Sequence, residues 1–227
     1  MSNLEPKKLN FNIDFLTAAE NPKLVDYELE LKKIQDQKDY EKYKNSGVPA
    51  KFFESSLDTY ITDTEEEKRN LKIVRDFTHD PKNKILLLWG NNGNGKSHLL
   101  SGIIRACGGE YITSSQLCVE YEAAISYHSK RTREEILNHY TKVKLLVIDE
   151  CGKYTLNEKL EQFILSYIFS TRHENDLATG AATNADKKEF IEFLGKSFFD
   201  RCTEVCTTLD FTEPSKRQGR RIIWNIY

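Results

Sequence analysis

The sequence lacks the residue patterns of disulfide-bonded, zinc-binding and membrane-spanning proteins. Its 227 residues include only 5 cysteines, 5 prolines and 1 methionine. The cysteines are scattered, with no C-x-x-C pair and no histidine near Cys202 or Cys206 to complete a zinc set. No apolar run approaches the roughly 20 residues of a membrane span, and residues 1–9 lack the apolar core of a signal peptide. We therefore expect reduced thiols, no structural metal and a cytoplasmic protein that does not enter the membrane.

Net charge is also nearly absent. The chain has 33 Lys and Arg against 35 Asp and Glu, a formal charge of −2. This balance argues against a protein that coats nucleic acid through a uniformly positive field, although a local basic groove is still allowed. The length suits one α/β domain with a short additional segment.

The chain does contain a phosphate-binding motif. Residues 90–97 read G-N-N-G-N-G-K-S, which fits the P-loop pattern G-x-x-x-x-G-K-[ST] at each fixed position. An apolar strand-like run at 84–89 precedes it and a helical pattern follows, so backbone N–H groups and a helix dipole favour an anion there. We predict ATP binding, with Lys96 at the β- and γ-phosphates and Ser97 on Mg²⁺. The predicted nucleotide contacts are Gly90, Asn91, Asn92, Gly93, Asn94, Gly95, Lys96, Ser97 and His98.

Two acids end a later apolar run, L-L-V-I-D-E at 145–150. A strand that ends this way delivers both carboxylates to the edge of the sheet where nucleotides bind. Asp149 is predicted to ligate Mg²⁺, and Glu150 to orient or deprotonate the attacking water. Asn184, at the tip of the following predicted strand, suits a contact with the γ-phosphate or that water, but Asn is also a common turn former.

Strand and helix patterns alternate through the rest of the chain. Strands are expected at 84–89, 110–113, 144–148, 177–183 and 204–211, and helices at 64–78, from 97, at 115–127, 129–140, 158–173, 186–193 and 196–202. This alternation predicts an α/β fold with a parallel sheet covered by helices on both faces. The turn-forming residues N-S-G-V-P at 45–49 separate a helical N-terminal segment, 1–45, from a nucleotide-binding domain, 46–227.

An apolar stripe marks the N-terminal segment. Leu24, Tyr27, Leu31 and Ile34 follow one another at 3-4-3 spacing on a charged helix that is expected to start near Pro22. The stripe either packs on the chain's own ATPase domain or binds a partner protein.

The order of these motifs resembles the AAA+ ATPases of the DnaC/DnaI helicase-loader and IstB group. The shared features are the P-loop followed by H-L, the D-E strand end, T-N at 183–184 and L-G-K-S-F-F-D-R at 194–201. S-G-V-P-A-K-F at 46–52 and T-R-H-E at 171–174 are similar too, so the resemblance covers about residues 46–217. It implies an AAA+ P-loop NTPase fold without a C-terminal lid domain, and ATP hydrolysis with Mg²⁺.

The resemblance also implies individual roles. Asn184 would be sensor 1, and Arg201 the arginine finger that reaches the γ-phosphate of a neighbouring subunit. Arg217 is the first choice for sensor 2, but Lys216 replaces the family's tyrosine, and Arg220 and Arg221 are alternatives. A finger supplied by a neighbour is worth roughly 10³–10⁵ in rate in other phosphoryl-transfer systems. We therefore expect self-association through the ATP sites, and weak ATPase activity in the monomer.

A basic cluster, Lys130, Arg131 and Arg133, lies where an extra helix of related loaders and initiators touches single-stranded DNA. A few such cations give weak, salt-sensitive binding, and the flanking Tyr127 and Tyr140 suit stacking on bases. The alternative is a solvated helix face, because glutamates at 134–135 interrupt the cations.

The resemblance implies an ATP-dependent loader that delivers the DnaB-type replicative helicase onto single-stranded DNA in replication initiation. Residues 1–45 contain no cysteine or histidine and so look like the helical DnaC type of helicase-binding segment. Two alternatives stay open: an IstB-like transposition ATPase that assembles on duplex DNA, and a nucleotide-gated interaction module. The short N-terminal segment and the small net charge favour the loader.

Overall fold

The computed structural model describes residues 22–82, 84–126, 129–152, 156–196, 199–200, 204–213 and 216, and for residues 22–29 only the helical backbone. The chain divides into two compact units, Met1–Glu41 and Lys42–Tyr227. None of the helices within these described ranges is long and apolar enough to cross a bilayer.

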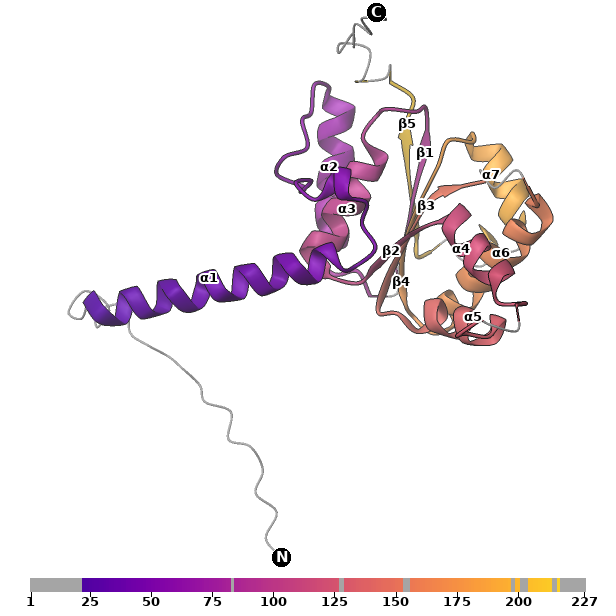
Figure 1. Ribbon diagram of the computed structural model, residues 1–227. Helices are drawn as coiled ribbons and strands as arrows, with labels where there is room; N and C mark the ends of the chain where they lie inside the picture. Colours follow the sequence, from indigo (N-terminus) through magenta and orange to yellow (C-terminus); the bar gives the residue numbers. More distant parts are fainter. Residues whose placement is uncertain are drawn as a thin grey trace, which may run out of the picture. The chain divides into compact units, whose positions relative to one another are not determined.

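Helix α1 (Pro22–Lys44) begins at the predicted proline and extends well past the apolar stripe (Figure 1). Proline suits the first turn of a helix because the N–H that it lacks has no partner there. Within the first unit, Leu31 and Ile34 are each 47% exposed. In the second unit, Tyr43 in the last turn is buried and its hydroxyl donates to the Phe52 carbonyl at 2.7 Å.

The second unit is built on five parallel strands in the order β2-β3-β4-β1-β5. This arrangement confirms the predicted parallel sheet. The strands are β1 (Ile85–Gly90), β2 (Glu110–Thr113), β3 (Leu145–Cys151), β4 (Ala178–Thr183) and β5 (Cys206–Phe211). β1 lies between β4 and the edge strand β5, so the P-loop that follows it emerges one strand in from that side of the sheet.

Helices cover both faces of the sheet (Figure 1). On one face lie α2 (Glu65–His79) and α3 (Lys96–Cys107); on the other lie α4 (Ser114–Ala123), α5 (Arg133–Lys142), α6 (Glu158–Glu174) and α7 (Lys187–Leu194). A one-turn helix, η2 (Ala50–Phe52), precedes α2. Four of these helices start with a capping box, in which the side chain before the helix and the residue at its third position bond each other's backbone N–H.

One predicted helix start is wrong. The helix expected at 129–140 begins at Arg133, because the Thr132 side chain accepts from the Glu135 N–H and the Glu135 carboxylate accepts from the Thr132 N–H. The helix expected at 115–127 ends at Ala123. The short helix expected at 196–202 lies largely outside the described residues.

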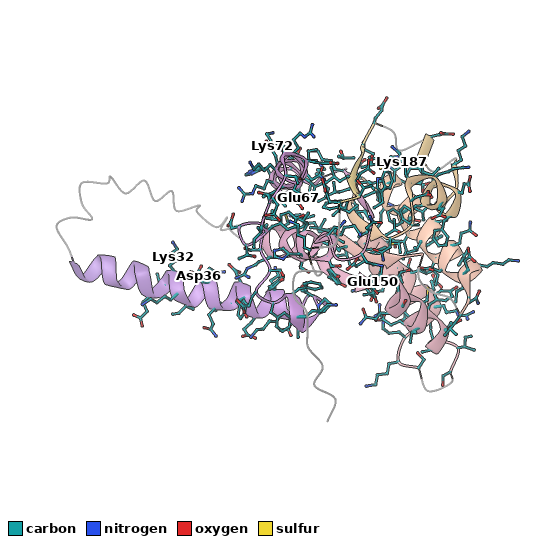
Figure 2. The ribbon with its side chains drawn as sticks, turned by 90° about the horizontal axis from the view of Figure 1, so that it is seen from above. Lys32, Asp36, Glu67, Lys72, Glu150 and Lys187 are labelled. Carbon is teal, nitrogen blue, oxygen red and sulfur yellow. The ribbon has the colours of Figure 1, made fainter. Side chains whose placement is uncertain are left out.

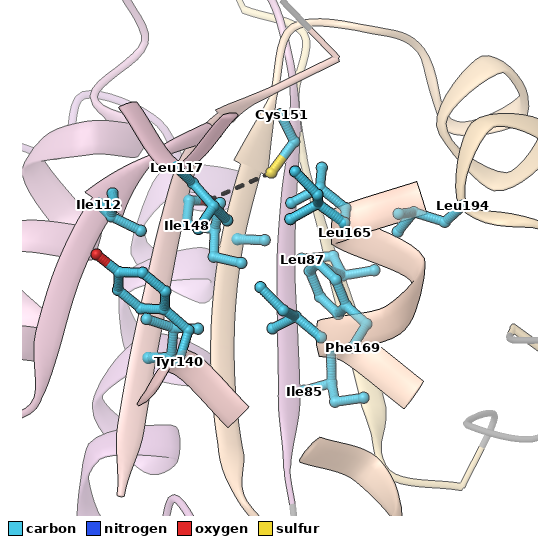
Figure 3. Close-up of a cluster of buried hydrophobic side chains, with 14 of the residues drawn as sticks. Ile85, Leu87, Ile112, Leu117, Tyr140, Ile148, Cys151, Leu165, Phe169 and Leu194 are labelled. Atoms are coloured by element: carbon cyan, nitrogen blue, oxygen red, sulfur yellow. Dashed lines mark hydrogen bonds between the residues drawn. The ribbon is translucent and has the colours of Figure 1, made fainter. Parts of the chain in front are cut away.

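The main hydrophobic core lies between the sheet and the α4–α7 layer (Figure 3). Alternate β1 residues Ile85 and Leu87 meet Leu165 and Phe169 of α6 there, and all four are at most 2% exposed. Cys107, Cys118, Cys151 and Cys206 are free thiols; Cys202 lies outside the described residues.

Candidate nucleotide-binding site

The P-loop joins β1 to the N-terminus of α3. Gly95 is the N-cap of α3 and has a left-handed backbone, with φ of 85°. A Cβ there would lie 2.5 Å from the ring of Tyr60, so both backbone and packing require glycine. Lys96 is 6% exposed, and its ammonium donates to the carbonyls of Gly90 at 2.6 Å and Asn91 at 2.8 Å. The loop thus curls around a cation at the positive end of a helix, which is the geometry of a phosphate site.

Two asparagines of the loop anchor it to the chain after β5. The Asn91 amide donates to the Thr212 carbonyl at 3.0 Å, and the Asn94 amide donates to the carbonyls of Phe211 at 2.9 Å and Glu213 at 2.5 Å. The amide groups of both side chains are therefore used to hold the loop in place. The backbone N–H of Asn91 also serves this anchor, because it donates to the Phe211 carbonyl at 2.9 Å.

The segment before α2 supports the loop from the other side. The Tyr60 hydroxyl donates to the Asn94 carbonyl at 3.2 Å, and its ring meets His98 edge-on with centroids 5.5 Å apart. His98 Nε2 lies 2.9 Å from the Ser56 carbonyl oxygen and 3.2 Å from Thr59 Oγ1. The predicted nucleotide contact His98 thus also ties α3 to this segment.

Asp149 lies near the end of β3, and both of its carboxylate oxygens accept hydrogen bonds. It is 5% exposed; Oδ1 accepts from the Glu150 N–H at 2.8 Å and Oδ2 from the Tyr111 hydroxyl at 2.5 Å. Burial, with the negative charge of Asp149, raises the pKa of Tyr111 well above its usual value, so this hydroxyl keeps its proton. The sequence did not single out Tyr111.

Glu150 adopts a left-handed backbone with φ of 59°, which costs an ordinary residue about 1–2 kcal/mol. The pairing of β3 with β4 shifts register between Ile148 and Cys151, which places Glu150 in an irregularity at the strand end. The Thr183 hydroxyl, donating to the Cys151 carbonyl at 2.8 Å, fixes the next residue. Strained residues of this kind concentrate at functional sites. Figure 2 labels Glu150.

These elements surround one cavity of about 280 Å³. It brings together the predicted residues Asp149, Glu150 and Asn184 with the P-loop from Asn92 to His98; Gly90 and Asn91 are not in its lining. Lys51 and Phe52 also line the cavity, although the sequence analysis did not assign them to the site. The only sequence feature that pointed to them is the motif at 46–52, which resembles the helicase-loader group.

The oxygen ligands available in the cavity suit Mg²⁺. Mg²⁺ prefers carboxylate and hydroxyl oxygens and takes most of its other ligands from phosphate and water, which fits a site made of Asp149 and Ser97. Over the described ranges, His, Cys, Asp and Glu side chains do not gather in threes into a metal cage.

Not every predicted residue can be placed at this cavity. Arg201, Arg217, Arg220, Arg221 and Tyr127 fall outside the described residues. The stacking role expected for Tyr140 is wrong, because Tyr140 is 6% exposed and its hydroxyl donates to Glu120 at 3.0 Å.

Two of the three predicted DNA-binding cations have contacts within the chain. Arg131 lies 4.0 Å from Glu120, and the Arg133 guanidinium lies over the Tyr121 ring, 4.6 Å from its centroid. Lys130 is exposed. Lys130 therefore offers the least encumbered positive charge of the cluster.

The layered parallel sheet, its strand order and the P-loop at its edge match the fold of AAA+ P-loop proteins. A crystal structure of the DnaC helicase loader has this fold: it aligns with a TM-score of 0.63 and 21% identity over 72% of this chain and 100% of that one. A family model described as RNA helicase matches residues 86–189.

Within this class the chain resembles replicative helicase loaders of the DnaC/DnaI type, as its motifs predicted. It is 27% identical over 168 residues to the replicative helicase loader DnaC of Escherichia coli strain K12, covering 70% of this chain and 67% of the relative. It is also 27% identical to the DnaC of Buchnera aphidicola from Acyrthosiphon pisum, covering 69% of this chain. The match spans 66% of that relative's length, just under two thirds.

Proposed function

We propose that this protein is an ATPase that loads the replicative helicase onto single-stranded DNA in replication initiation. The observation that carries the proposal is the convergence of the P-loop, Asp149, Glu150 and Asn184 on one cavity. The relatives named as replicative helicase loaders support the task.

In the proposed reaction, the P-loop and Lys96 bind the phosphates of ATP, while Ser97 and Asp149 hold Mg²⁺. Glu150 orients or deprotonates the attacking water, and Asn184 hydrogen-bonds the γ-phosphate or that water. Arg201 of a neighbouring subunit completes the site, so turnover is weak in a monomer and rises when subunits assemble. Arg217 is the proposed sensor 2 residue.

The partner contacts are proposed on two surfaces. Residues 1–45 bind the helicase, and the apolar side chains Leu31 and Ile34 on α1 support this because they are half exposed. The basic cluster Lys130, Arg131 and Arg133 supplies a salt-sensitive contact to single-stranded DNA.

The task is tested by mixing the protein with the replicative helicase from the same source and measuring complex masses by mass photometry, with and without ATP. We expect a stoichiometric complex that a Leu31→Glu, Ile34→Glu double variant loses. Lys32→Ala with Asp36→Ala is the matched control, since both side chains are exposed on the same helix (Figure 2). The loader assignment is refuted if no complex forms and ATP instead drives oligomers on duplex DNA, the behaviour of a transposition ATPase.

The chemistry is tested by two substitutions. Lys96→Ala should abolish ATP binding, measured with a fluorescent ATP analogue. Arg201→Ala should abolish turnover while leaving ATP affinity largely intact, because the arginine acts on a neighbour's nucleotide. Loss of binding in Arg201→Ala would assign that residue a structural role.

A further inference from the structure

Tyr111 contacts the predicted Mg²⁺ ligand Asp149 without being a predicted ligand itself. It lies in β2, the edge strand, where it is 3% exposed, and its hydroxyl donates to Asp149 Oδ2 at 2.5 Å. A buried hydroxyl therefore contacts one carboxylate oxygen of the predicted metal ligand.

The contact gives the Asp149 carboxylate its second hydrogen-bond donor. The Glu150 N–H holds Oδ1 of Asp149, and Tyr111 holds Oδ2, so the plane of the carboxylate is set by two donors. Hydrogen-bond partners of this kind orient metal ligands, and their loss typically costs about 10–100-fold in metal affinity.

The backbone of Tyr111 is itself held by the residues that follow α1. The Tyr111 N–H donates to the Ser46 carbonyl at 2.7 Å. Gly47 has φ of 89°, and a Cβ there would lie 2.1 Å from the Tyr111 carbonyl oxygen, so the two chain segments approach as closely as only glycine allows. The position of the Tyr111 hydroxyl thus depends on residues 46–47.

We propose that Tyr111 is a positioning residue of the magnesium site: its hydroxyl sets the geometry of Asp149, and the Ser46–Gly47 turn holds it there. The proposal rests on the ATP binding proposed above. Its role is in affinity for the metal; the nucleotide itself is bound by the P-loop. Replacing Tyr111 should therefore weaken Mg²⁺ binding more than binding of metal-free ATP.

The test compares Tyr111→Phe with Tyr140→Phe, because each removes one hydroxyl from a buried tyrosine that donates to a carboxylate. Affinity for a fluorescent ATP analogue is measured in EDTA and then across a Mg²⁺ titration, with thermal unfolding recorded for each variant. We expect Tyr111→Phe to bind metal-free nucleotide normally and to need about 10–100-fold more Mg²⁺ for its metal-dependent change. Tyr140→Phe should need the same Mg²⁺ as the unaltered protein.

An unchanged Mg²⁺ midpoint in Tyr111→Phe, or an equal shift in both variants, would overturn the positioning role. Failure of the unaltered protein to bind nucleotide under any condition would instead overturn the proposed ATPase function. A second readout keeps the hydroxyl in place: ¹⁹F NMR of the chain carrying fluorotyrosine at position 111. Its resonance should shift when Mg²⁺ is added to the ATP-bound protein, and no shift would count against the contact.

Discussion

Lys216 joins the chain after β5 to the start of α2 and to the P-loop. Its ammonium lies 2.7 Å from Glu67 Oε1, donates to the Ile61 carbonyl at 2.5 Å and sits 4.9 Å from the Tyr60 ring centroid. Its backbone N–H donates to the Gly93 carbonyl at 3.2 Å. The Lys216→Met substitution removes the charge and keeps most of the aliphatic stem, so it isolates the ion pair from the packing.

The magnitude follows from how deeply Glu67 is buried. Glu67 is 5% exposed, and its other oxygen accepts from the N–H groups of Asp63 at 2.6 Å and Thr64 at 3.3 Å. A hydrogen bond to a charged group contributes about 1.5–3 kcal/mol, and breaking a fully buried pair costs about 3–5 kcal/mol. The Lys216 side chain is 28% exposed, which leaves water able to solvate part of the pair. We therefore expect Lys216→Met to lower the free energy of unfolding by about 1.5–3 kcal/mol.

The loss should depend on pH. Burial by itself would raise the Glu67 pKa, but the Lys216 hydrogen bond and the backbone donors hold this pKa below its usual value. A lowered folded-state pKa stabilises the protein above the unfolded value, about 4.3, and this contribution disappears as pH falls through the folded value. The difference between Lys216→Met and the unaltered protein should therefore be full at pH 7 and shrink below about pH 4.

The effect is measured by urea and thermal unfolding, once at pH 7 and once below about pH 4. For a chain of this size, a loss of 1 kcal/mol lowers the unfolding temperature by about 2–4 °C. The control is Lys72→Met on α2, the helix that carries Glu67 (Figure 2); its ion pair with Asp76 at 2.8 Å is exposed, so its loss should change stability little. Equal losses in the two variants, or a loss in Lys216→Met that does not change with pH, would refute the reasoning.

Three further predictions concern other strained or buried positions. Because Glu150 has φ of 59°, Glu150→Gly should be more stable to urea than Glu150→Ala by about 1 kcal/mol, with ATPase activity lost in both. Gly47→Ala places a Cβ against the Tyr111 carbonyl, so it should destabilise the fold by about 1–3 kcal/mol and raise the Mg²⁺ requirement for ATP-analogue binding. Burial raises the pKa of Cys118 to about 12 and also raises the pKa of Cys151, so neither thiol should react with iodoacetamide at pH 8 until urea is added. Peptide mass spectrometry reports the labelling, and reaction of either thiol in the native protein at the rate of the unfolded one would contradict this burial.

Local signals in the sequence were enough to predict most of the fold. The P-loop and the D-E strand end are each a contiguous stretch of sequence. The local chain alone therefore brings the residues of each motif together. The helix expected at 64–78 is present, and α2 starts directly after its cap, Thr64. The start of α5 was misplaced because the helical pattern was extended back to 129, past the capping box that Thr132 forms with Glu135.

Contacts between distant segments could not be predicted in this way. Tyr111 and Asp149 meet because β2 and β3 pair in register, which no local pattern specifies. Tyr140 looked available for stacking in the sequence, but it shares the buried face of α5 with Ile136, four residues earlier. The contact of Lys216 with Glu67 likewise depends on where the chain after β5 returns.

These distant contacts tie the proposed nucleotide site to both ends of the second unit. The turn after α1 holds Tyr111 through Ser46, and the chain after β5 meets the P-loop through Lys216 and Gly93. If helicase binding to residues 1–45 moves that turn, it changes Mg²⁺–ATP affinity, and by linkage Mg²⁺–ATP changes helicase affinity by the same factor. Tyr111→Phe removes one step of the connection. The factor by which Mg²⁺–ATP alters helicase affinity should therefore fall toward one in that variant, and an unchanged factor would mean that the coupling passes through another contact.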